Sequence, residues 1–253
     1  MGKLIVHKNT YSKNLDNYRD IIVFVPDSYY ESNKEYPVIY FHDGMEAFFK
    51  EWSLSNTSWG VQDTVDRLIK EKEVPEVICV GISNNHERFS EYSHVHFKSE
   101  AFNIEAEGKG EKYEAFVLEE IIPSINSMYR TNGDMYMVGS SMGGVATLMT
   151  AVRNQEVFKG IVAMSSFLNI DKCKPIEYIE KYDLSNMPKI YFDYGVKEEE
   201  ELYAIPNNKL RNIFIDKGLK EGNDFMFVVD EDGIHSESCW AKRLPLALKY
   251  VMN

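Results

Sequence analysis

The sequence predicts an α/β fold in which a mainly parallel central sheet is covered by helices on both faces. Short apolar segments alternate along the chain with segments of helical period, as βαβ units require. Residues 36–41 are apolar almost throughout, which is typical of a strand that is buried on both faces. A chain of 253 residues, 44% of them hydrophobic, can build a large core within one domain. We therefore expect a single domain that covers residues 1–253.

The expected elements follow one another in regular alternation. The expected strands are residues 20–26, 36–41, 77–81, 135–138, 160–164, 189–195 and 225–229. The expected helices are residues 61–70, 113–128, 145–152, 176–182, 207–217 and 240–252. Pro123 should kink or restart the helix in which it lies. Residues 83–112 interrupt the alternation with polar and aromatic residues, and we expect a lid-like insertion there, because so long a loop in a compact domain is usually functional.

Charge and composition argue against several classes of partner. The net charge of −12 disfavours binding to nucleic acid and to anionic membranes. No apolar run approaches the length of a membrane span, and residues 1–8 lack the apolar core of a signal peptide. Cys79, Cys173 and Cys239 are scattered and form no C-x-x-C motif, which fits a reducing compartment. We therefore expect a cytoplasmic protein with no nucleic-acid or membrane partner.

Residues 138–144 contain a G-x-S-x-G motif formed by Gly139, Ser141 and Gly143. A strand-like segment precedes the motif and a helical segment follows it. This is the context of a nucleophile elbow, whose strained turn leaves little room for side chains beside the serine. The bare pattern arises by chance in about one chain in fifteen of this length, so other parts of the sequence must support it.

Two further polar groups follow later strands in a suggestive order. Sites in open parallel sheets form at the carboxyl ends of the strands. Glu198 follows the expected strand 189–195 and His235 follows the last expected strand, which gives the order serine, acid, histidine of α/β-hydrolases. His235 could take the proton of Ser141 and return it to the leaving group, while a carboxylate orients the imidazole. The carboxylates that compete with Glu198 for this role are Glu199, Glu200, Glu201 and Asp193.

An oxyanion hole requires two backbone amides that point at the developing negative charge. One would be the amide of Met142, directly after the nucleophile. The other should be the amide of Met45, in the loop after strand 36–41, where Gly44 lets the backbone turn. His42 and Asp43 are expected to hold this loop through hydrogen bonds.

His94 and His96 place two imidazoles on one face of an extended segment. A zinc site needs at least three protein ligands, and no clear third ligand accompanies this pair. We therefore expect these residues to contribute to the aromatic lining of the insertion. Neither a metal nor a cofactor is implied.

With these residues in place, the chain resembles the family of α/β-hydrolases named "Putative esterase". This family groups enterochelin-esterase-like proteins, carbohydrate esterases such as feruloyl and acetylxylan esterases, and S-formylglutathione hydrolases. The resemblance covers nearly the whole chain, and it is carried by residues 36–45, 91–93, 129–131, 139–144, 191–195 and 235–240. The H-x-E-x-x-W pattern of residues 235–240 is most similar to the enterochelin-esterase-like branch.

The resemblance implies an α/β-hydrolase fold with Ser141 as the nucleophile and His235 as the base. It implies that the amides of Met45 and Met142 form the oxyanion hole. The family's acid maps to Glu198, although many members carry aspartate there and this chain has a run of glutamates.

We therefore expect a serine carboxylic-ester hydrolase that works through an acyl-enzyme on a small or carbohydrate-linked ester. One alternative is a siderophore trilactone esterase, which would need cations near the serine. Another is an inactive hydrolase fold that serves as a binding module. A small-molecule ester is the expected partner, and the sequence is also compatible with a homo-oligomer. The residues expected to contact the substrate are Trp59, Arg88, Tyr92, Phe167 and Trp240, and Arg88 would do so by pairing with an anionic group.

Overall fold

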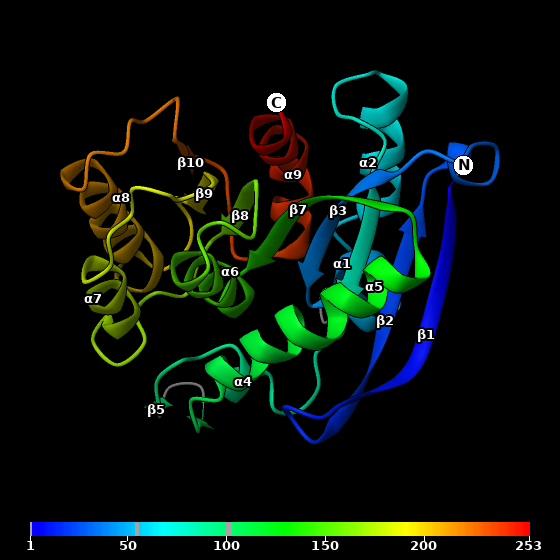
Figure 1. Ribbon diagram of the computed structural model, residues 1–253. Coiled ribbons are helices and arrows are strands. Elements are labelled where there is room, and N and C mark those ends of the chain that lie inside the picture. The colour runs from blue at the N-terminus through cyan, green and yellow to red at the C-terminus, as the bar shows by residue number, and fades with distance from the viewer. Residues whose placement is uncertain (1, 54–55, 100–102) are drawn as a thin grey trace.

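The computed structural model describes residues 2–53, 56–99 and 103–253. Its main strands are β1 (Lys3–Ser12), β2 (Asn17–Val25), β3 (Tyr36–His42), β4 (Ile78–Ile82), β7 (Thr131–Ser140), β8 (Gly160–Met164), β9 (Lys189–Gly195) and β10 (Phe225–Asp230). Within the described residues they form an eight-stranded sheet in the order β1-β2-β4-β3-β7-β8-β9-β10 (Figure 1). The β1–β2 and β2–β4 pairs are antiparallel, and all pairs from β4 to β10 are parallel.

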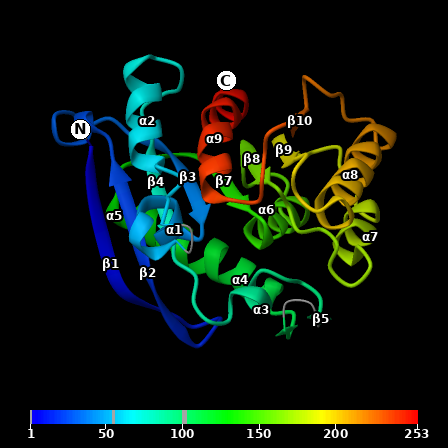
Figure 2. The same ribbon diagram turned by 180° about the vertical axis from the view of Figure 1, so that it is seen from behind.

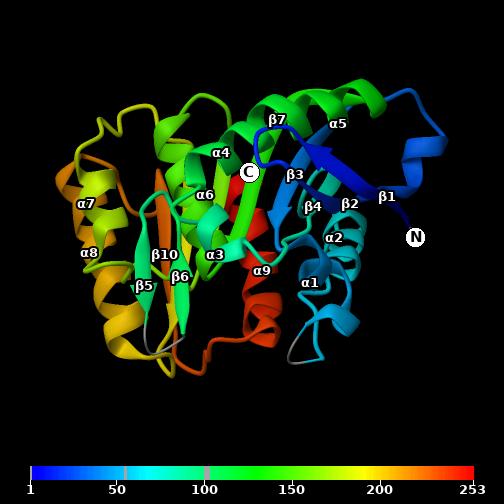
Figure 3. The ribbon, with the colours of Figure 1, turned by 90° about the horizontal axis from the view of Figure 1, so that it is seen from below.

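Helices cover both faces of this sheet. They are α1 (Gly44–Phe48), α2 (Val61–Lys70), α3 (Arg88–Glu91), α4 (Gly110–Ala115), α5 (Ile122–Met128), α6 (Met142–Arg153), α7 (Lys174–Glu180), α8 (Ile205–Asp216) and α9 (Glu237–Met252). Helices α4 to α8 pack against one face, and α1, α2 and α9 pack against the other, as Figure 3 shows from below and Figure 2 from behind. The predicted α/β class, with a mainly parallel sheet between helices, is confirmed.

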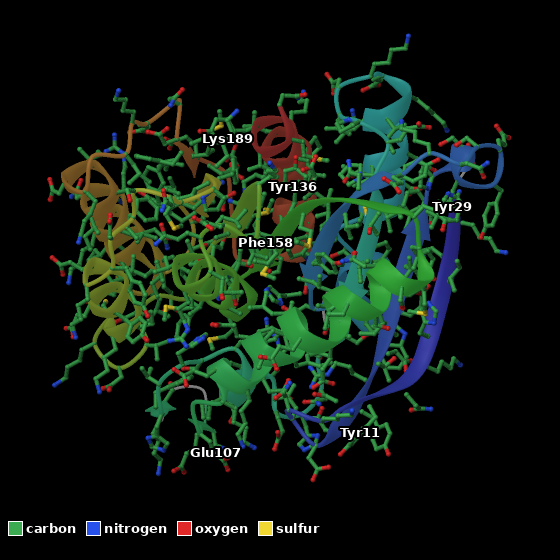
Figure 4. All side chains as sticks on the ribbon, viewed as in Figure 1. Tyr11, Tyr29, Glu107, Tyr136, Phe158 and Lys189 are labelled. Atoms are coloured by element: carbon green, nitrogen blue, oxygen red, sulfur yellow. The ribbon has the colours of Figure 1, made fainter. Side chains whose placement is uncertain are left out.

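The register of the parallel strands brings their carboxyl ends to one edge of the sheet. Tyr136, Phe158 and Lys189 lie close together near the beginnings of β8 and β9 (Figure 4). At the other end, Ser140 pairs with Met164. The residues that follow β7, β8, β9 and β10 therefore gather at this second edge, where a site is expected.

Most predicted elements lie within a few residues of the observed ones. The helix predicted at residues 61–70 is α2, and the strand predicted at residues 160–164 is β8. The helix predicted at residues 113–128 is built from α4, a π-helical segment η3 (Phe116–Ile121) and α5. Pro123 lies in the first turn of α5, so it restarts the helix as predicted. No helix in the described parts of the chain is both long and apolar enough to cross a membrane.

The segment of residues 83–112 contains α3 and a two-stranded antiparallel sheet of β5 (Phe97–Ser99) and β6 (Ile104–Ala106). Residues 100–102 lie outside the described part of the chain. The segment is anchored to β2 by an ion pair in which two guanidinium nitrogens of Arg19 lie 2.9 and 2.7 Å from the carboxylate oxygens of Glu91. Both side chains are fully buried, so this end of the segment is held firmly against the sheet.

Candidate active site

Ser141 occupies the turn between β7 and α6 with a strained backbone conformation. Its φ is 55° and its ψ is −122°, a combination that non-glycine residues rarely adopt. A Cβ atom on Gly139 would collide with the carbonyl of Gly143, which explains why the turn requires glycine at residue 139. A Cβ on Gly143 would lie 3.2 Å from the Cβ of His42, in the strand beside it. The backbone of the turn is therefore closely packed against itself and against β3. It places Ser141 at the carboxyl edge of the sheet.

His235 follows β10 and reaches the serine from the edge of the sheet. Its Nε2 atom lies 3.1 Å from the Oγ atom of Ser141. The imidazole is held between two aromatic rings. The Tyr203 ring lies at 4.5 Å with an interplanar angle of 31°, and the Trp240 ring meets it edge-on at 4.9 Å. These contacts limit the rotation of the imidazole.

Glu198 is the carboxylate that faces the other ring nitrogen of His235. Its Oε2 atom lies 3.6 Å from Nδ1 of His235, and its side chain is fully buried. Among the described residues, this oxygen accepts no hydrogen bond. The three glutamates that follow it in sequence are exposed: Glu199, Glu200 and Glu201.

Asp193, the remaining candidate for the acid, is committed to other partners. Its carboxylate accepts a hydrogen bond from the backbone amide of Ser165 at 3.0 Å and pairs with Nε of Arg243 at 3.1 Å. Burial raises the pKa of the Asp193 carboxyl to about 6, although the Arg243 guanidinium lowers it. This carboxylate therefore connects β9 to Ser165, which follows β8, and to Arg243 of α9.

Ser165 connects the acid to two side chains of α9. Nε1 of Trp240 and Nη2 of Arg243 lie 3.0 and 2.9 Å from the Ser165 oxygen, and both groups can only donate. The hydroxyl hydrogen must therefore point elsewhere, and it is donated to Oε1 of Glu198 at 2.6 Å. Ser165 thus fixes one oxygen of Glu198 and leaves the other oxygen toward His235.

Neither Ser165 nor Arg243 was identified from the sequence. Ser165 directly follows β8, so its place at the carboxyl end of a parallel strand is a signal that could have found it. Arg243 lies within α9, where a single arginine gives no such signal. Its role becomes visible only when α9 packs against the sheet and brings its guanidinium between buried carboxylates.

The loops that carry the acid and the histidine are joined at their bases. A Cβ atom on Gly195 would collide with the carbonyl of Gly233, so the two backbones touch only because both residues are glycine. The amide of Lys197 also donates to the carbonyl of Gly233 at 3.0 Å. The positions of Glu198 and His235 are therefore coupled through the backbone.

The loop after β3 is held by a second arginine–carboxylate pair. Asp43 has a left-handed backbone, and its two carboxylate oxygens each receive a hydrogen bond of 2.7 Å from Arg88. Asn84 donates a third hydrogen bond of 2.7 Å. Burial raises the pKa of the Asp43 carboxyl, but the charge and hydrogen bonds of Arg88 and Asn84 leave this pKa below its ordinary value. Asp43 thus holds the loop, as expected from the sequence.

His42 lies in the same region and is also structural in its contacts. Its Nδ1 atom is 2.8 Å from the hydroxyl of Tyr113, and burial lowers the pKa of its imidazole to about 4. Met45 lies in the first turn of α1, and Met142 is the first residue of α6. Amides in the first turn of a helix have no partner within the helix, so both can bind another acceptor.

A cleft of about 450 Å³ lies beside Ser141 and His235. Trp59, Arg88 and Trp240, which the sequence suggested as pocket walls, all line it, and Arg88 is engaged by Asp43. Sequence reasoning did not identify the exposed indole of Trp52 at this cleft. The lining residues are Asp43, Glu46, Trp52, Trp59, Asn84, Arg88, Phe89, Ser140, Ser141, His235, Glu237 and Trp240.

Two of the suggested pocket residues lie elsewhere. Tyr92 is 0% exposed and lies behind the cleft, where its hydroxyl accepts a hydrogen bond from the amide of Asp43 at 3.2 Å. Its expected contact with substrate is therefore wrong, because the side chain supports the wall from within. Phe167 lines a neighbouring pocket of about 350 Å³ that β5 also borders. It contacts the Tyr203 ring at 5.9 Å and does not line the cleft beside Ser141.

The two histidines of the insertion have separate acidic partners. Nε2 of His94 lies 3.2 Å from a carboxylate oxygen of Glu114, and Nε2 of His96 lies 3.5 Å from that of Glu105. His94 is buried and His96 is exposed, so they do not form one site. The described parts of the chain contain no group of three potential ligands that could hold a metal ion.

The fold and the site together define the class of protein. A mainly parallel sheet, a serine in a strained strand–helix turn and a histidine after the last strand are the features of an α/β-hydrolase. The family described as "Putative esterase" matches residues 12–251, and the chain belongs to this family. It is therefore a serine esterase.

Individual relatives resemble the chain over nearly its whole length. It is 24% identical over 259 residues to the uncharacterized protein YjcH of Bacillus subtilis (strain 168), a match that covers 98% of this chain and 97% of that protein. An IroE-like serine hydrolase from Shewanella oneidensis has a TM-score of 0.79 at 18% identity, over 99% of this chain and 80% of that one. A ferulic acid esterase has a TM-score of 0.77 at 24% identity, over 99% and 97% of the two chains. These structural likenesses concern the fold.

Proposed function

We propose that the chain hydrolyses carboxylic esters through an acyl-enzyme on Ser141, with His235 as general base and Glu198 as the acid that orients it. The observation that carries this proposal is the 3.1 Å contact between Nε2 of His235 and Oγ of Ser141 at the strained turn. A serine hydroxyl is a weak nucleophile until a base removes its proton during attack. This contact supplies that base.

The reaction would proceed in two halves. Ser141 attacks the ester carbonyl while its proton moves to Nε2 of His235, and the amides of Met45 and Met142 bind the oxyanion. The imidazolium then protonates the leaving alcohol, and water releases the acyl group in the same way. Glu198 stabilises the imidazolium through Nδ1. Their 3.6 Å separation is long for a hydrogen bond, and catalytic contacts of this kind commonly tighten when substrate binds.

The cleft favours neutral esters, either small or linked to carbohydrate. Of the described residues that line it, only Arg88 carries a positive charge, and this charge is already paired with Asp43. Glu46 and Glu237 add negative charge to the same cleft. A siderophore trilactone with catecholate groups would meet little cationic surface, so we do not favour that substrate. An inactive binding module is disfavoured by the intact contact of serine with histidine.

We also propose that the chain forms a single domain in which residues 83–112 are a lid-like insertion at the cleft. Arg88 and Phe89 in α3 support this placement because they line the cleft. The three cysteines are free in the structure, which supports a cytoplasmic location. The expected partner is a small-molecule ester.

A fluorophosphonate probe tests the central proposal. It should label the wild-type protein at one equivalent and fail to label Ser141→Ala. Labelling that survives this substitution, or a folded wild-type protein that is not labelled, would overturn the proposal. A panel of p-nitrophenyl acyl esters, acetylated sugars, feruloyl esters and ferric siderophores then tests the substrate class, and a preference for siderophores would contradict it.

A further inference from the structure

We propose that Tyr203 is a further catalytic residue, whose hydroxyl donates a hydrogen bond to the oxygen of the leaving alcohol when the acyl-enzyme forms. This inference rests on the proposed function. Tyr203 belongs to a π-helical segment, η4 (Glu200–Ala204), which follows the acid and leads into α8. Such segments are rare and are frequently found at functional sites.

The phenol hydroxyl lies at the reacting atoms. It is 3.4 Å from Nε2 of His235, the same nitrogen that contacts Ser141, and it is within hydrogen-bonding reach of the Ser141 side chain. The ring packs over the imidazole at 4.5 Å and against the Phe167 ring at 5.9 Å. Tyr203 is only 7% exposed, so the hydroxyl has a defined position.

The Tyr203 hydroxyl and Ser141 compete for the one lone pair of Nε2 on His235. A neutral imidazole has one lone pair for hydrogen bonding, which lies in the ring plane, and Ser141 already occupies the direction of Nε2. The contact of the Tyr203 hydroxyl with Nε2 is also the longer of the two, at 3.4 Å against 3.1 Å for Ser141. The oxygens of Ser141 and of the substrate are therefore the acceptors within reach.

The hydroxyl also keeps its proton. Burial raises the pKa of the Tyr203 phenol above its ordinary value, and the negative charge of Glu198 raises it further. Tyr203 therefore keeps its proton near neutral pH and remains a hydrogen-bond donor there.

The chemical step remains balanced. When the tetrahedral adduct collapses, the bond between the carbonyl carbon and the leaving oxygen breaks, and its electron pair stays on that oxygen. The oxygen takes the proton from Nε2 of the His235 imidazolium. Tyr203 donates a hydrogen bond to the same oxygen while this charge develops and does not give up its own proton.

This role identifies the class of leaving group. Stabilisation by a donor is largest when much negative charge builds up on the leaving oxygen. Aliphatic and sugar alcohols are far poorer leaving groups than p-nitrophenol, because their alkoxides are much more basic and hold the negative charge on one oxygen. The hydroxyl of Tyr203 thus adapts the site to esters of ordinary alcohols.

The substitution Tyr203→Phe removes the hydroxyl and keeps the ring that stacks on His235. We would measure kcat/KM for acetate esters of p-nitrophenol, phenol, trifluoroethanol and ethanol. The expected loss is about 30-fold or more for the ethyl ester and under about threefold for the p-nitrophenyl ester. Tyr194→Phe is the matched control, because the Tyr194 hydroxyl contacts Asn208 away from the reacting atoms. It should change every value by under about twofold.

Active-site titration with the fluorophosphonate counts the folded, competent sites of each variant, so a folding defect does not enter the comparison. An equal loss on all four esters would mean that Tyr203 only positions His235, and no loss on any ester would mean that its hydroxyl is idle. Either result, with Ser141 still labelled, overturns this inference while the proposed function stands. Absence of labelling in the wild type would instead overturn both.

Discussion

Two arginine–carboxylate pairs lie near Ser141, Arg88 with Asp43 and Arg243 with Glu198. They differ in whether both oxygens of the carboxylate accept hydrogen bonds. Arg88 bonds both oxygens of Asp43 at 2.7 Å, so this pair is closed. Glu198 is bound through one oxygen to Ser165, and Arg243 lies 3.9 Å from that same oxygen. Its second oxygen is buried and directed at His235. A closed carboxylate can only hold a loop, whereas an open one retains capacity to stabilise a charge that appears during a reaction.

Neutralising each carboxylate in turn is the most direct test of the difference between Glu198 and Asp43. Glu198→Gln should lower kcat/KM for p-nitrophenyl acetate by about 10³-fold or more, because an amide cannot stabilise the imidazolium. Its free energy of unfolding should stay near the wild-type value. Asp43→Asn should instead lower the free energy of unfolding by about 2–4 kcal/mol and change kcat/KM by under about tenfold. Equal losses of activity in the two variants would refute the distinction.

The arginines give the second test. Arg243→Met leaves buried carboxylates without their cation, and we expect urea denaturation to show a loss of about 3–5 kcal/mol. Arg88→Met should lose less, about 1–3 kcal/mol, because the Arg88 side chain is 23% exposed and water can reach the gap.

The loss in Arg243→Met should also depend on pH. The pKa of Asp193 is already raised in the folded protein, and removing Arg243 raises it further. A raised folded-state pKa favours the folded state at low pH, and this contribution disappears as pH rises through that pKa. The loss should therefore be smaller at pH 5 than at pH 8, and a loss that is independent of pH would contradict this explanation.

His42 lies beside the pair of Arg88 and Asp43. We expect its titration to lower the free energy of unfolding as pH falls, which is opposite to the effect of Asp193. Its pKa is about 4 in the folded protein against an ordinary 6.5, so the unfolded chain binds the proton first as pH falls. Between pH 7 and pH 4.5 the wild type should lose about 2.5 kcal/mol more stability than His42→Gln, in which residue 42 cannot titrate. Equal losses in the two proteins would show that His42 protonates readily when folded.

Ser165 offers the smallest effect and the most specific one. Ser165→Ala frees one oxygen of Glu198, and kcat/KM should fall about 10- to 30-fold, mainly through kcat. Ser166→Ala is the matched control, because the Ser166 hydroxyl is buried and, in the described residues, makes no hydrogen bond. A similar loss in both variants would point to packing, with no separate role for the Ser165 hydroxyl.

Strong local signals in the sequence were sufficient for the central elements of the fold. The strands β3, β8 and β9 are mainly apolar and are buried on both faces, and the motif around Ser141 marks a strand–helix turn. β1 was missed because it is a largely exposed edge strand without clear alternation. β5 and β6 are too short for their pattern to show. Tyr92 was misplaced because an aromatic residue beside Arg88 suggests a pocket wall, whereas its side chain points into the core.

The candidate site divides in the same way. The contact of Ser141 with His235 was predictable, because both follow parallel strands and such ends meet at one edge of the sheet. Glu198 could not be separated from its neighbours until burial distinguished them. Arg243 and Tyr203 were invisible because each reaches the site through the packing of a helical segment. The sequence pattern indicates which strand a residue follows. It does not indicate which side chains of a packed helix lie at the site.

The contact between Gly195 and Gly233 joins the loops of Glu198 and His235 into one unit, and Ser141 lies outside that unit. Ser141 directly follows β7 at the centre of the sheet, while Glu198 and His235 are tied together after β9 and β10 at its edge. Edge strands detach before central ones when a protein opens locally. Opening of β9 and β10 together would therefore carry the base and its acid away and leave the nucleophile without either. Loss of activity on mild heating would then report the opening of one edge while the core is still folded.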